Sequence, residues 1–180
     1  MTVSIPRVDD SATHIGALRR HFADLRDSNH GGATSRPEKE RLFRDTTELL
    51  APYSLQALEE INDGLLLGQG TIADSGVVRD QELSLLRSWT LNWNEQKELN
   101  LPPITLLAYY GVGFHHPHLR GGTVREWPLN VFTDEQAKAE LPVLRAIAEA
   151  ELHNLVFYAD YRIVPATSAI QPLHGTGFIR

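Results

Sequence analysis

Three of the eight histidines in this 180-residue chain lie in one short stretch, GVGFHHPHLRGG, from Gly111 to Gly122. They are His115, His116 and His118. On an extended segment, side chains two residues apart point to the same side, so the imidazoles of His116 and His118 are able to bind one metal ion. The sequence therefore predicts a metal site at this loop, with all three histidines as ligands and with His116 and His118 as catalytic groups.

A further ligand is expected from a helix later in the chain. Glu149 and His153 are four residues apart, so they share one helix face. Two loop histidines, with His153 as another ligand and Glu149 as a catalytic carboxylate, would leave one position on a divalent metal open for a substrate. Zinc, iron and manganese suit such ligands. Two other interpretations stay open: one histidine acts as an acid or base without a metal, or the loop is a structural or surface turn.

The same region is poor in acidic residues. Between Leu99 and Thr133 the only acid is Glu126, while Arg120 and Arg125 lie close to the histidines in sequence. The two glycines after Arg120 would let backbone N–H groups approach a phosphate or a carboxylate, which a guanidinium binds with two hydrogen bonds. This pattern predicts that Arg120 binds an anionic group, and a chance depletion of acids is the alternative.

A second candidate region is the stretch ELSLLRSWTLNW, where apolar and polar residues alternate as in a half-buried strand. Arg87 interrupts its apolar side. Three explanations are open: a β-bulge turns the side chain outward, a buried carboxylate pairs with it, or it recognises an anion in a pocket. In the last case the ligand is a flat or aromatic acid, and the pocket is lined by Arg87, Trp89, Trp93, Tyr109 and Tyr110.

The first third of the chain is predicted to be helical. Residues 11–27 carry one apolar face, and His14 and His21 beside it are interpreted as structural. Ser35 and Glu38 have capping-box spacing and open a second helix, which Pro52 is expected to end before a third helix over 55–65. The apolar face of the first helix consists of Ile15, Leu18, Phe22 and Leu25.

The period then changes to that of strands. Residues 70–80 and 82–93 are predicted to form a hairpin, 104–114 a central strand and 123–132 an edge strand. A long helix begins after a second capping box at Thr133, Pro142 kinks or restarts it, and 161–166 and 175–180 are short strands or extended tail. Because helices and strands are segregated, we predict an α+β fold: N-terminal helices packed on a small, mainly antiparallel sheet, with a long helix in the C-terminal half.

Length and composition predict one globular domain over residues 1–180, with 1–10 and 166–180 extended or loosely ordered. The chain has no cysteine, which excludes disulfides and thiolate chemistry. Its formal net charge of −6 argues against nucleic-acid binding, and no apolar run is long enough to span a membrane. The phosphate-loop, HExxH and GxSxG motifs are all missing from the sequence. These features predict a cytoplasmic protein.

Together, these patterns predict a small soluble enzyme that uses the His115–His118 loop, with or without a divalent metal, on a small anionic or aromatic molecule. The alternative is a non-catalytic ligand-binding module or accessory subunit whose histidine and arginine loop docks on a partner. A homo-oligomer is compatible with either function. An enzyme requires the predicted side chains to converge, whereas a docking loop leaves them spread over a surface.

Overall fold

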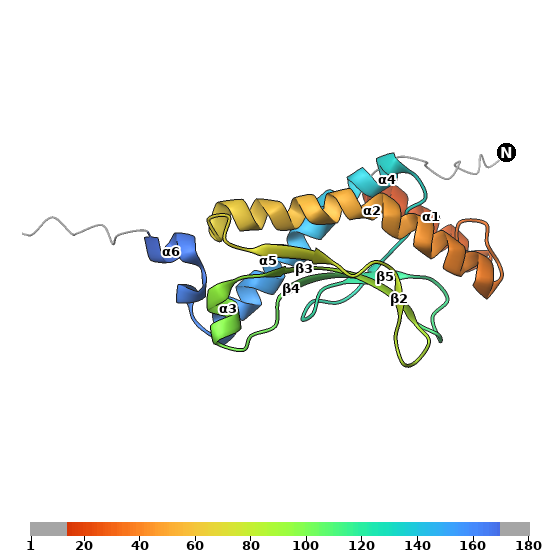
Figure 1. The fold of residues 1–180 in the computed structure, drawn as a ribbon. Helices are drawn as coiled ribbons and strands as arrows, with labels where there is room; N and C mark the ends of the chain where they lie inside the picture. The colour runs from red at the N-terminus through yellow and green to blue at the C-terminus, as the bar shows by residue number, and fades with distance from the viewer. Residues whose placement is uncertain (1–13, 170–180) are drawn as a thin grey trace, which may run out of the picture.

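One antiparallel sheet with helices packed against one of its faces makes up the architecture (Figure 1). The computed structural model describes residues 14–169. The strand order is β1-β3-β4-β5-β6, and β2 pairs with β3 as well. The elements in chain order are α1 (His14–Arg26), α2 (Arg36–Leu65), β1 (Thr71–Asp74), β2 (Val78–Arg79), β3 (Leu85–Asn92), α3 (Asn94–Glu98), β4 (Ile104–Tyr110), β5 (His118–Arg120), β6 (Trp127–Pro128), α4 (Asp134–Ala139), α5 (Leu141–Tyr158), η1 (Tyr161–Ile163) and α6 (Pro165–Ala169).

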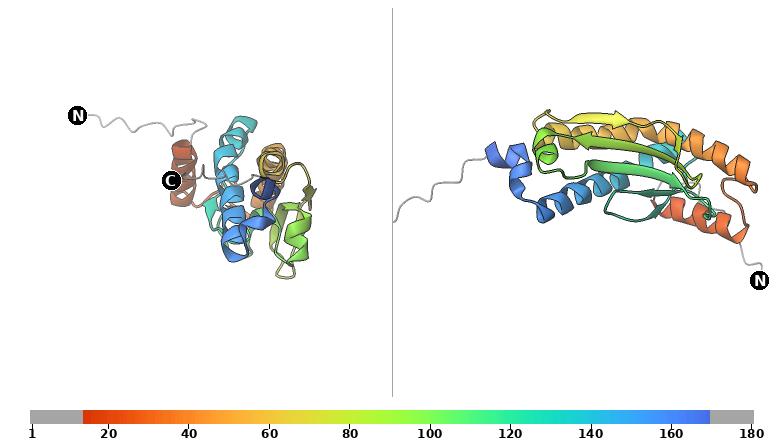
Figure 2. Two further views of the ribbon diagram at one scale, coloured as in Figure 1. Left: turned by 90° about the vertical axis from the view of Figure 1, so that its left-hand side faces the viewer. Right: turned by 60° about the horizontal axis from the view of Figure 1, so that its bottom comes forward.

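The central strands β3 and β4 have one buried and one partly exposed face. Every second residue of each strand is buried, as the alternating sequence of β3 predicted. The buried face packs against α2 and α5, and Figure 2 shows both helices on the same side of the sheet. The α+β prediction is confirmed. Among residues 14–169, no helix combines the length and the apolar character needed to cross a membrane.

The helix end that was predicted at Pro52 is absent, because α2 continues through Pro52 from Arg36 to Leu65. Proline removes one backbone hydrogen bond and crowds the preceding turn. However, Phe43 and Leu50 before Pro52 and Leu58 after it are fully buried in the same core. Packing of both halves against one sheet therefore outweighs the local effect of the proline. The predicted start of this helix, with its capping box at Ser35, is confirmed.

The C-terminal half follows the prediction at its start and departs from it at its end. Thr133 accepts a hydrogen bond from the N–H of Gln136 and opens α4, and α5 restarts at Leu141 with Pro142 in its first turn. The predicted final strand over 161–166 is instead a 3-10 turn and the start of α6, so residues 166–169 are helical rather than extended. Residues 1–10 and 175–180 lie outside the described part of the chain.

The orientation of α1 is opposite to the one its sequence predicted. The four apolar residues of its stripe are exposed, with Phe22 60% and Ile15 47% accessible, whereas His21 is buried. Polar contacts set this orientation: Arg20 donates to the side-chain oxygen of Asn130 at 3.1 Å, and Asn130 donates to Asp24 at 2.9 Å. Because Asn130 is itself buried, these bonds hold the polar side of α1 against the protein. The side chain of His14 lies outside the described residues.

Arg87 is buried and paired, as in the second of the three explanations, but its partners Asp74 and Glu48 are exposed rather than buried carboxylates. Its guanidinium binds both carboxylate oxygens of Asp74, at 3.0 and 2.7 Å, and donates to Glu48 at 2.7 Å. The pairing lowers the pKa of Asp74, mainly through the hydrogen bond from Arg87. All three guanidinium nitrogens are engaged, so Arg87 has a structural role that joins β3 to β1 and α2.

We predict that Asp74→Ala lowers the free energy of unfolding by about 2 kcal/mol, because it leaves a buried guanidinium short of a partner. The matched change Glu48→Ala removes a carboxylate whose side chain is 72% exposed, and it should cost under about 0.5 kcal/mol. Urea unfolding of both variants measures the difference. An equal loss of unfolding free energy in the two variants would show that the pair of Arg87 with Asp74 is no more stabilising than the pair with Glu48.

Candidate functional site

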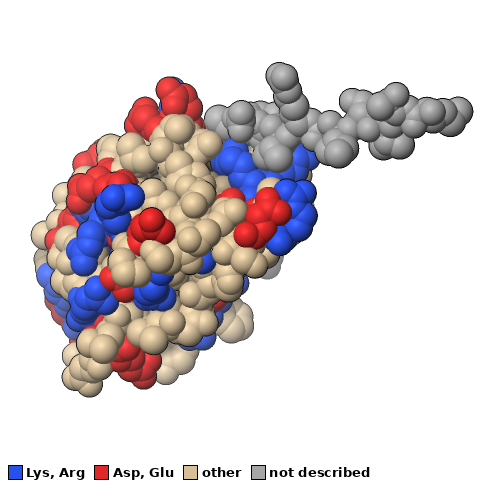
Figure 3. Space-filling model, turned by 90° about the vertical axis from the view of Figure 1, so that its right-hand side faces the viewer, with Lys and Arg blue, Asp and Glu red and all other residues tan. Residues whose placement is uncertain are grey.

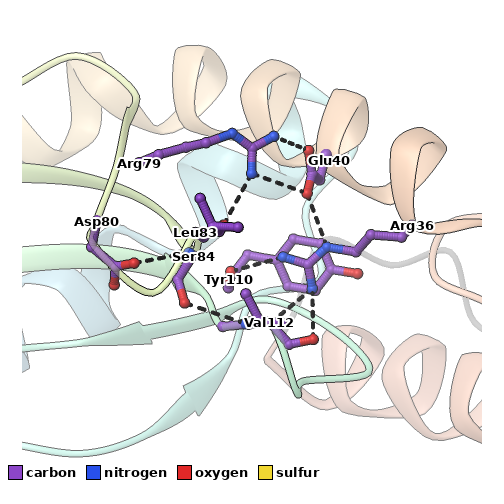
Figure 4. Close-up of polar contacts among 9 residues, drawn as sticks. Arg36, Glu40, Arg79, Asp80, Leu83, Ser84, Tyr110 and Val112 are labelled. Atoms are coloured by element: carbon purple, nitrogen blue, oxygen red, sulfur yellow. Dashed lines mark hydrogen bonds and ion pairs between the residues drawn. The ribbon is translucent and has the colours of Figure 1, made fainter.

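The loop after β4 is held by the amino end of α2. Arg36 donates to the carbonyl oxygens of Gly111 at 2.7 Å and Tyr110 at 3.2 Å, and its guanidinium lies 3.6 Å from the centre of the Tyr110 ring (Figure 4). Glu40, one turn further along α2, fixes the other edge of the same guanidinium at 3.0 Å. The loop therefore leaves β4 in a direction set by α2.

The turn between β2 and β3 supports the loop from the opposite side (Figure 4). Asp80 accepts the N–H of Ser84 at 2.8 Å, which closes this turn. The hydroxyl of Ser84 then accepts the N–H of Val112 at 3.3 Å. Arg79 completes the frame because it binds both Glu40 and the carbonyl of Leu83. Three elements that are distant in sequence thus meet at residues 110–112.

Further along the same loop, Lys39 donates to the carbonyl oxygen of His115 at 3.1 Å. Lys39 is only 5% exposed, so its ammonium is used inside the protein rather than in solvent. The His115 side chain is exposed, whereas His116 and His118 are partly buried. The backbone of the histidine loop is therefore tied to α2 where it leaves β4 and again at His115.

The structure brings three imidazoles together, and one of them was interpreted as structural from the sequence. The ring centroids of His21 and His116 are 4.2 Å apart, and those of His116 and His118 are 4.5 Å apart. His21 comes from α1, so the cluster joins α1 to the loop before β5. A fourth ring, His30, is almost fully buried and packs on Phe132 with a centroid distance of 5.1 Å.

These imidazoles are held in their neutral form. Burial, followed by the neighbouring histidines, lowers the pKa of His116 to about 3. Burial also lowers the pKa of His21 and of His118, for which Glu126 acts in the opposite direction. Within the described residues, Nδ1 of His116 and Nδ1 of His118 are buried without a hydrogen-bond partner. Neutral imidazoles with unused nitrogens are able to accept a proton or bind a ligand.

His118 and Arg120 share the face of the sheet that points away from α2 and α5. The carboxylate of Glu126 lies 4.0 Å from Nδ1 of His118 and 3.7 Å from a guanidinium nitrogen of Arg120. The Arg120 guanidinium stacks 4.4 Å above the ring of Tyr109, which pairs with His118 across the strands. No residue in the range 14–169 makes a hydrogen bond with the Arg120 side chain, so its donors are available to a ligand.

Glu149 and His153 do not join this cluster. Glu149 lines a cavity with Glu60 and Arg145 beside the carboxyl-terminal half of α2, whereas the histidine loop contacts Lys39 near the other end of that helix. A helix rises about 1.5 Å per residue, so Lys39 and Glu60 are about 30 Å apart. His153 follows one turn later on α5 and is exposed. The predicted convergence of loop and helix is therefore absent.

A divalent metal does not fit the arrangement of side chains. Over residues 14–169, no group of three or more histidine, aspartate or glutamate side chains is placed to hold a metal ion. His116 contacts both His21 and His118, but the three imidazoles do not form a group placed as ligands about 2 Å from one metal ion must be. The chemistry considered below therefore uses the imidazoles themselves.

The glycine loop after Arg120 does bind a carboxylate, and that carboxylate belongs to the protein. Glu151 on α5 accepts hydrogen bonds from the N–H of Thr123 at 2.6 Å, the hydroxyl of Thr123 at 2.6 Å and the N–H of Val124 at 3.1 Å. A Cβ atom at Gly121 would lie 2.6 Å from Glu151, which explains the glycine. The predicted backbone anion site is thus filled, and only the Arg120 side chain stays available.

The predicted aromatic pocket is part of the core instead. Trp89, Trp93 and Tyr110 are at most 1% exposed, and the indole of Trp93 donates to the carbonyl of Ile163 at 2.6 Å. Arg87 is bound to Asp74, and none of these four side chains lines a cavity described for residues 14–169. Alternation alone places them correctly on one face of the sheet, but it does not reveal that α2 and α5 cover that face.

Charges are mixed around the end of the molecule that carries the histidine loop. Figure 3 shows acidic and basic side chains interspersed on this face, with an uncharged area between them. Such a surface does not attract polyanions over long distances, so any anion recognition depends on single side chains such as Arg120. No protein-family model, no curated protein sequence and no solved structure matches this chain.

We predict that acid destabilises the protein through His30. Burial lowers the pKa of His30 to about 4, below its usual value of 6.5. The unfolded chain therefore takes up the proton first, and stability that is present above pH 6.5 is lost as the pH falls toward 4. The contribution is about 3 kcal/mol at most.

The measurement is the free energy of unfolding between about pH 8 and pH 5 for wild type, His30→Phe and His30→Leu. Both variants should lose part of the pH dependence, whatever their stability at the higher pH. The control is His153→Gln on the exposed side of α5, which should keep the wild-type slope. A slope that is unchanged in both His30 variants would contradict the assignment.

Proposed function

We propose that the protein is a small enzyme that transfers protons on a small anionic molecule without a metal. The observation that supports it is the placement of His118, Arg120 and Glu126 together on the open face of the sheet. His118 supplies a neutral imidazole, which is the form needed in a general base. Arg120 binds the anionic group of the substrate with its available donors.

Each residue has a distinct role in this proposal. His118 removes a proton from the bound molecule and later returns it, and Glu126 beside Nδ1 orients the ring and stabilises its cationic form. The ring of Tyr109 supports the Arg120 guanidinium from below. His116 packs against His118. Burial lowers the pKa of His118, Glu126 raises it and Arg120 lowers it, so the ring is neutral until it takes up the substrate proton.

A second candidate function, docking on a partner, is favoured by α1. Its exposed stripe contains four apolar residues at spacings of three and four, which is the pattern of a buried helix face. An antiparallel pair of α1 helices related by a two-fold axis would cover this stripe with the same stripe of a second copy. The occupant that we propose for this face is therefore another copy of the chain.

The enzymatic proposal predicts solvent-hydrogen exchange that depends on His118. We expect a set of small carboxylic and phosphorylated acids in deuterium oxide to include one that gains deuterium in the presence of the protein, as followed by nuclear magnetic resonance. His118→Gln should slow this exchange by about 100-fold or more. Arg120→Leu should weaken the apparent affinity for the acid by about tenfold.

His153→Gln, on the far part of α5, is the matched histidine control and should exchange at the wild-type rate. An equal rate in His118→Gln would remove His118 as the base. If no acid in the set shifts the side-chain resonance of Arg120, the proposal that Arg120 binds the anionic group is wrong.

The docking proposal predicts a dimer that depends on Phe22. Light scattering during gel filtration should give twice the chain mass for wild type, and Phe22→Asp should give the chain mass, because a charge cannot be buried in the paired stripe. Phe157→Asp introduces the same charge at a residue of α5 that is 87% exposed, and it should leave the mass unchanged. A wild-type monomer at high concentration would contradict this function.

A further inference from the structure

A cavity of about 300 Å³ lies between α1, β6 and the junction of α4 with α5, and His118 is not among the described residues that line it. Its walls are almost entirely apolar. The one ionisable side chain among the described residues that line it is Glu140. The lining consists of Ala17, Leu18, Trp127, Pro128, Glu140 and Val143.

Glu140 is a largely buried carboxyl group in the wall of this cavity. It is 8% exposed, and its carboxylate makes no hydrogen bond with any residue of the described range. It precedes α5, but its side chain makes no capping hydrogen bond to that helix. Burial raises the pKa of Glu140, the charge of Arg20 acts against this, and the Arg20 guanidinium also donates to the side chain and carbonyl of Asn130.

Glu151 is a second buried carboxylate, and unlike Glu140 it is hydrogen-bonded within the protein. Glu151 lies on the same helix, is 2% exposed and accepts three hydrogen bonds from Thr123 and Val124. A largely buried carboxylate without hydrogen bonds is unfavourable even with a cation nearby, and an apolar residue at position 140 would fill the same space at lower free energy. The carboxylate is therefore explained best by a partner that comes from outside the chain.

The other described cavities do not combine apolar walls with a buried carboxyl group that lacks a hydrogen bond. The cavity beside Glu149 contains Glu60, but that carboxylate binds Arg145 through two short hydrogen bonds. The larger cavity of about 620 Å³ near Tyr158 is lined by no ionisable group except the phenol of that tyrosine. Among these described cavities, only the Glu140 cavity joins apolar walls, an aromatic ring and a largely buried carboxyl group, which are features of a small-molecule site.

We propose that this cavity binds a small ammonium compound with an apolar body, whose ammonium group pairs with Glu140 and whose body lies against Trp127. A cation supplies both the opposite charge and the hydrogen-bond donors that the carboxylate lacks. The face of an indole ring also attracts cations. The volume accommodates a compound of about ten non-hydrogen atoms.

The electrostatics of the empty cavity agree with this assignment. Burial raises the pKa of Glu140 to about 7, and Arg20 acts against this effect. The carboxyl group thus titrates close to neutral pH, and a bound ammonium group would favour its ionised form. Binding of the amine and loss of the Glu140 proton are therefore linked.

The test uses the full chain at about pH 8, where Glu140 is mostly ionised, with three probes of one shape: 2-phenylethylamine, 2-phenylethanol and phenylacetate. Binding is followed by amide shifts and by the indole resonance of Trp127. We expect the amine to bind with a dissociation constant of about 1 mM, given its size. The alcohol and the acid should bind at least about tenfold more weakly than the amine.

Two variants and one control locate the binding. Glu140→Gln should fold and melt at or above the wild-type temperature, because a largely buried charge is removed, and it should lose the preference for the amine. Leu18→Trp fills the cavity and should abolish binding of all three probes. Glu149→Gln changes a carboxylate in another cavity and should bind the amine as wild type does.

Three results would overturn the proposal. The first is no binding of the amine to wild type at roughly 10 mM, well above the affinity expected for its size. The second is an amine affinity that is unchanged in Glu140→Gln. The third is a preference for phenylacetate, which would show that the cavity takes acids and that Arg20 recognises them. Leu18→Trp and the three probes decide the question even if Glu140→Gln fails to fold.

Discussion

Two cations at the amino end of α2 hold the histidine loop by binding its backbone carbonyl groups. Arg36 binds the carbonyls of Tyr110 and Gly111, and Lys39 binds that of His115. Backbone carbonyls in a loop lack the partners that a sheet or helix provides, so these bonds decide which path the loop takes. The contacts of His116 with His21, and of His118 with Glu126, exist because this path is fixed.

The sequence predicted most elements because their causes are local. Alternation placed β3, a continuous apolar run placed β4, and the capping residues Ser35 and Thr133 placed the starts of α2 and α4. Pro52 was misjudged because its local effect is opposed by core contacts on both sides of it, which no window of sequence contains. The direction of α1 was missed for a similar reason, since Asn130, more than 100 positions away, determines which side of the helix faces inward.

The candidate site was predictable only in part. His118 and Arg120 are two residues apart in one strand, so their common face follows from the period of a strand. His21 could not be assigned to the cluster, because its neighbour His116 comes from a distant loop. The carboxylate that fills the glycine loop is also distant, and a pattern such as RGG does not tell a bound ligand from Glu151.

Helix α1 is common to both candidate sites, and this has a physical consequence. On one side His21 closes the imidazole cluster, and on the other Ala17 and Leu18 close the cavity that contains Glu140. Among the contacts of the described residues, Arg20 and Asp24 tie the helix to Asn130. One helix therefore forms a wall of both candidate sites, and a substitution in α1 on either side is expected to act on both.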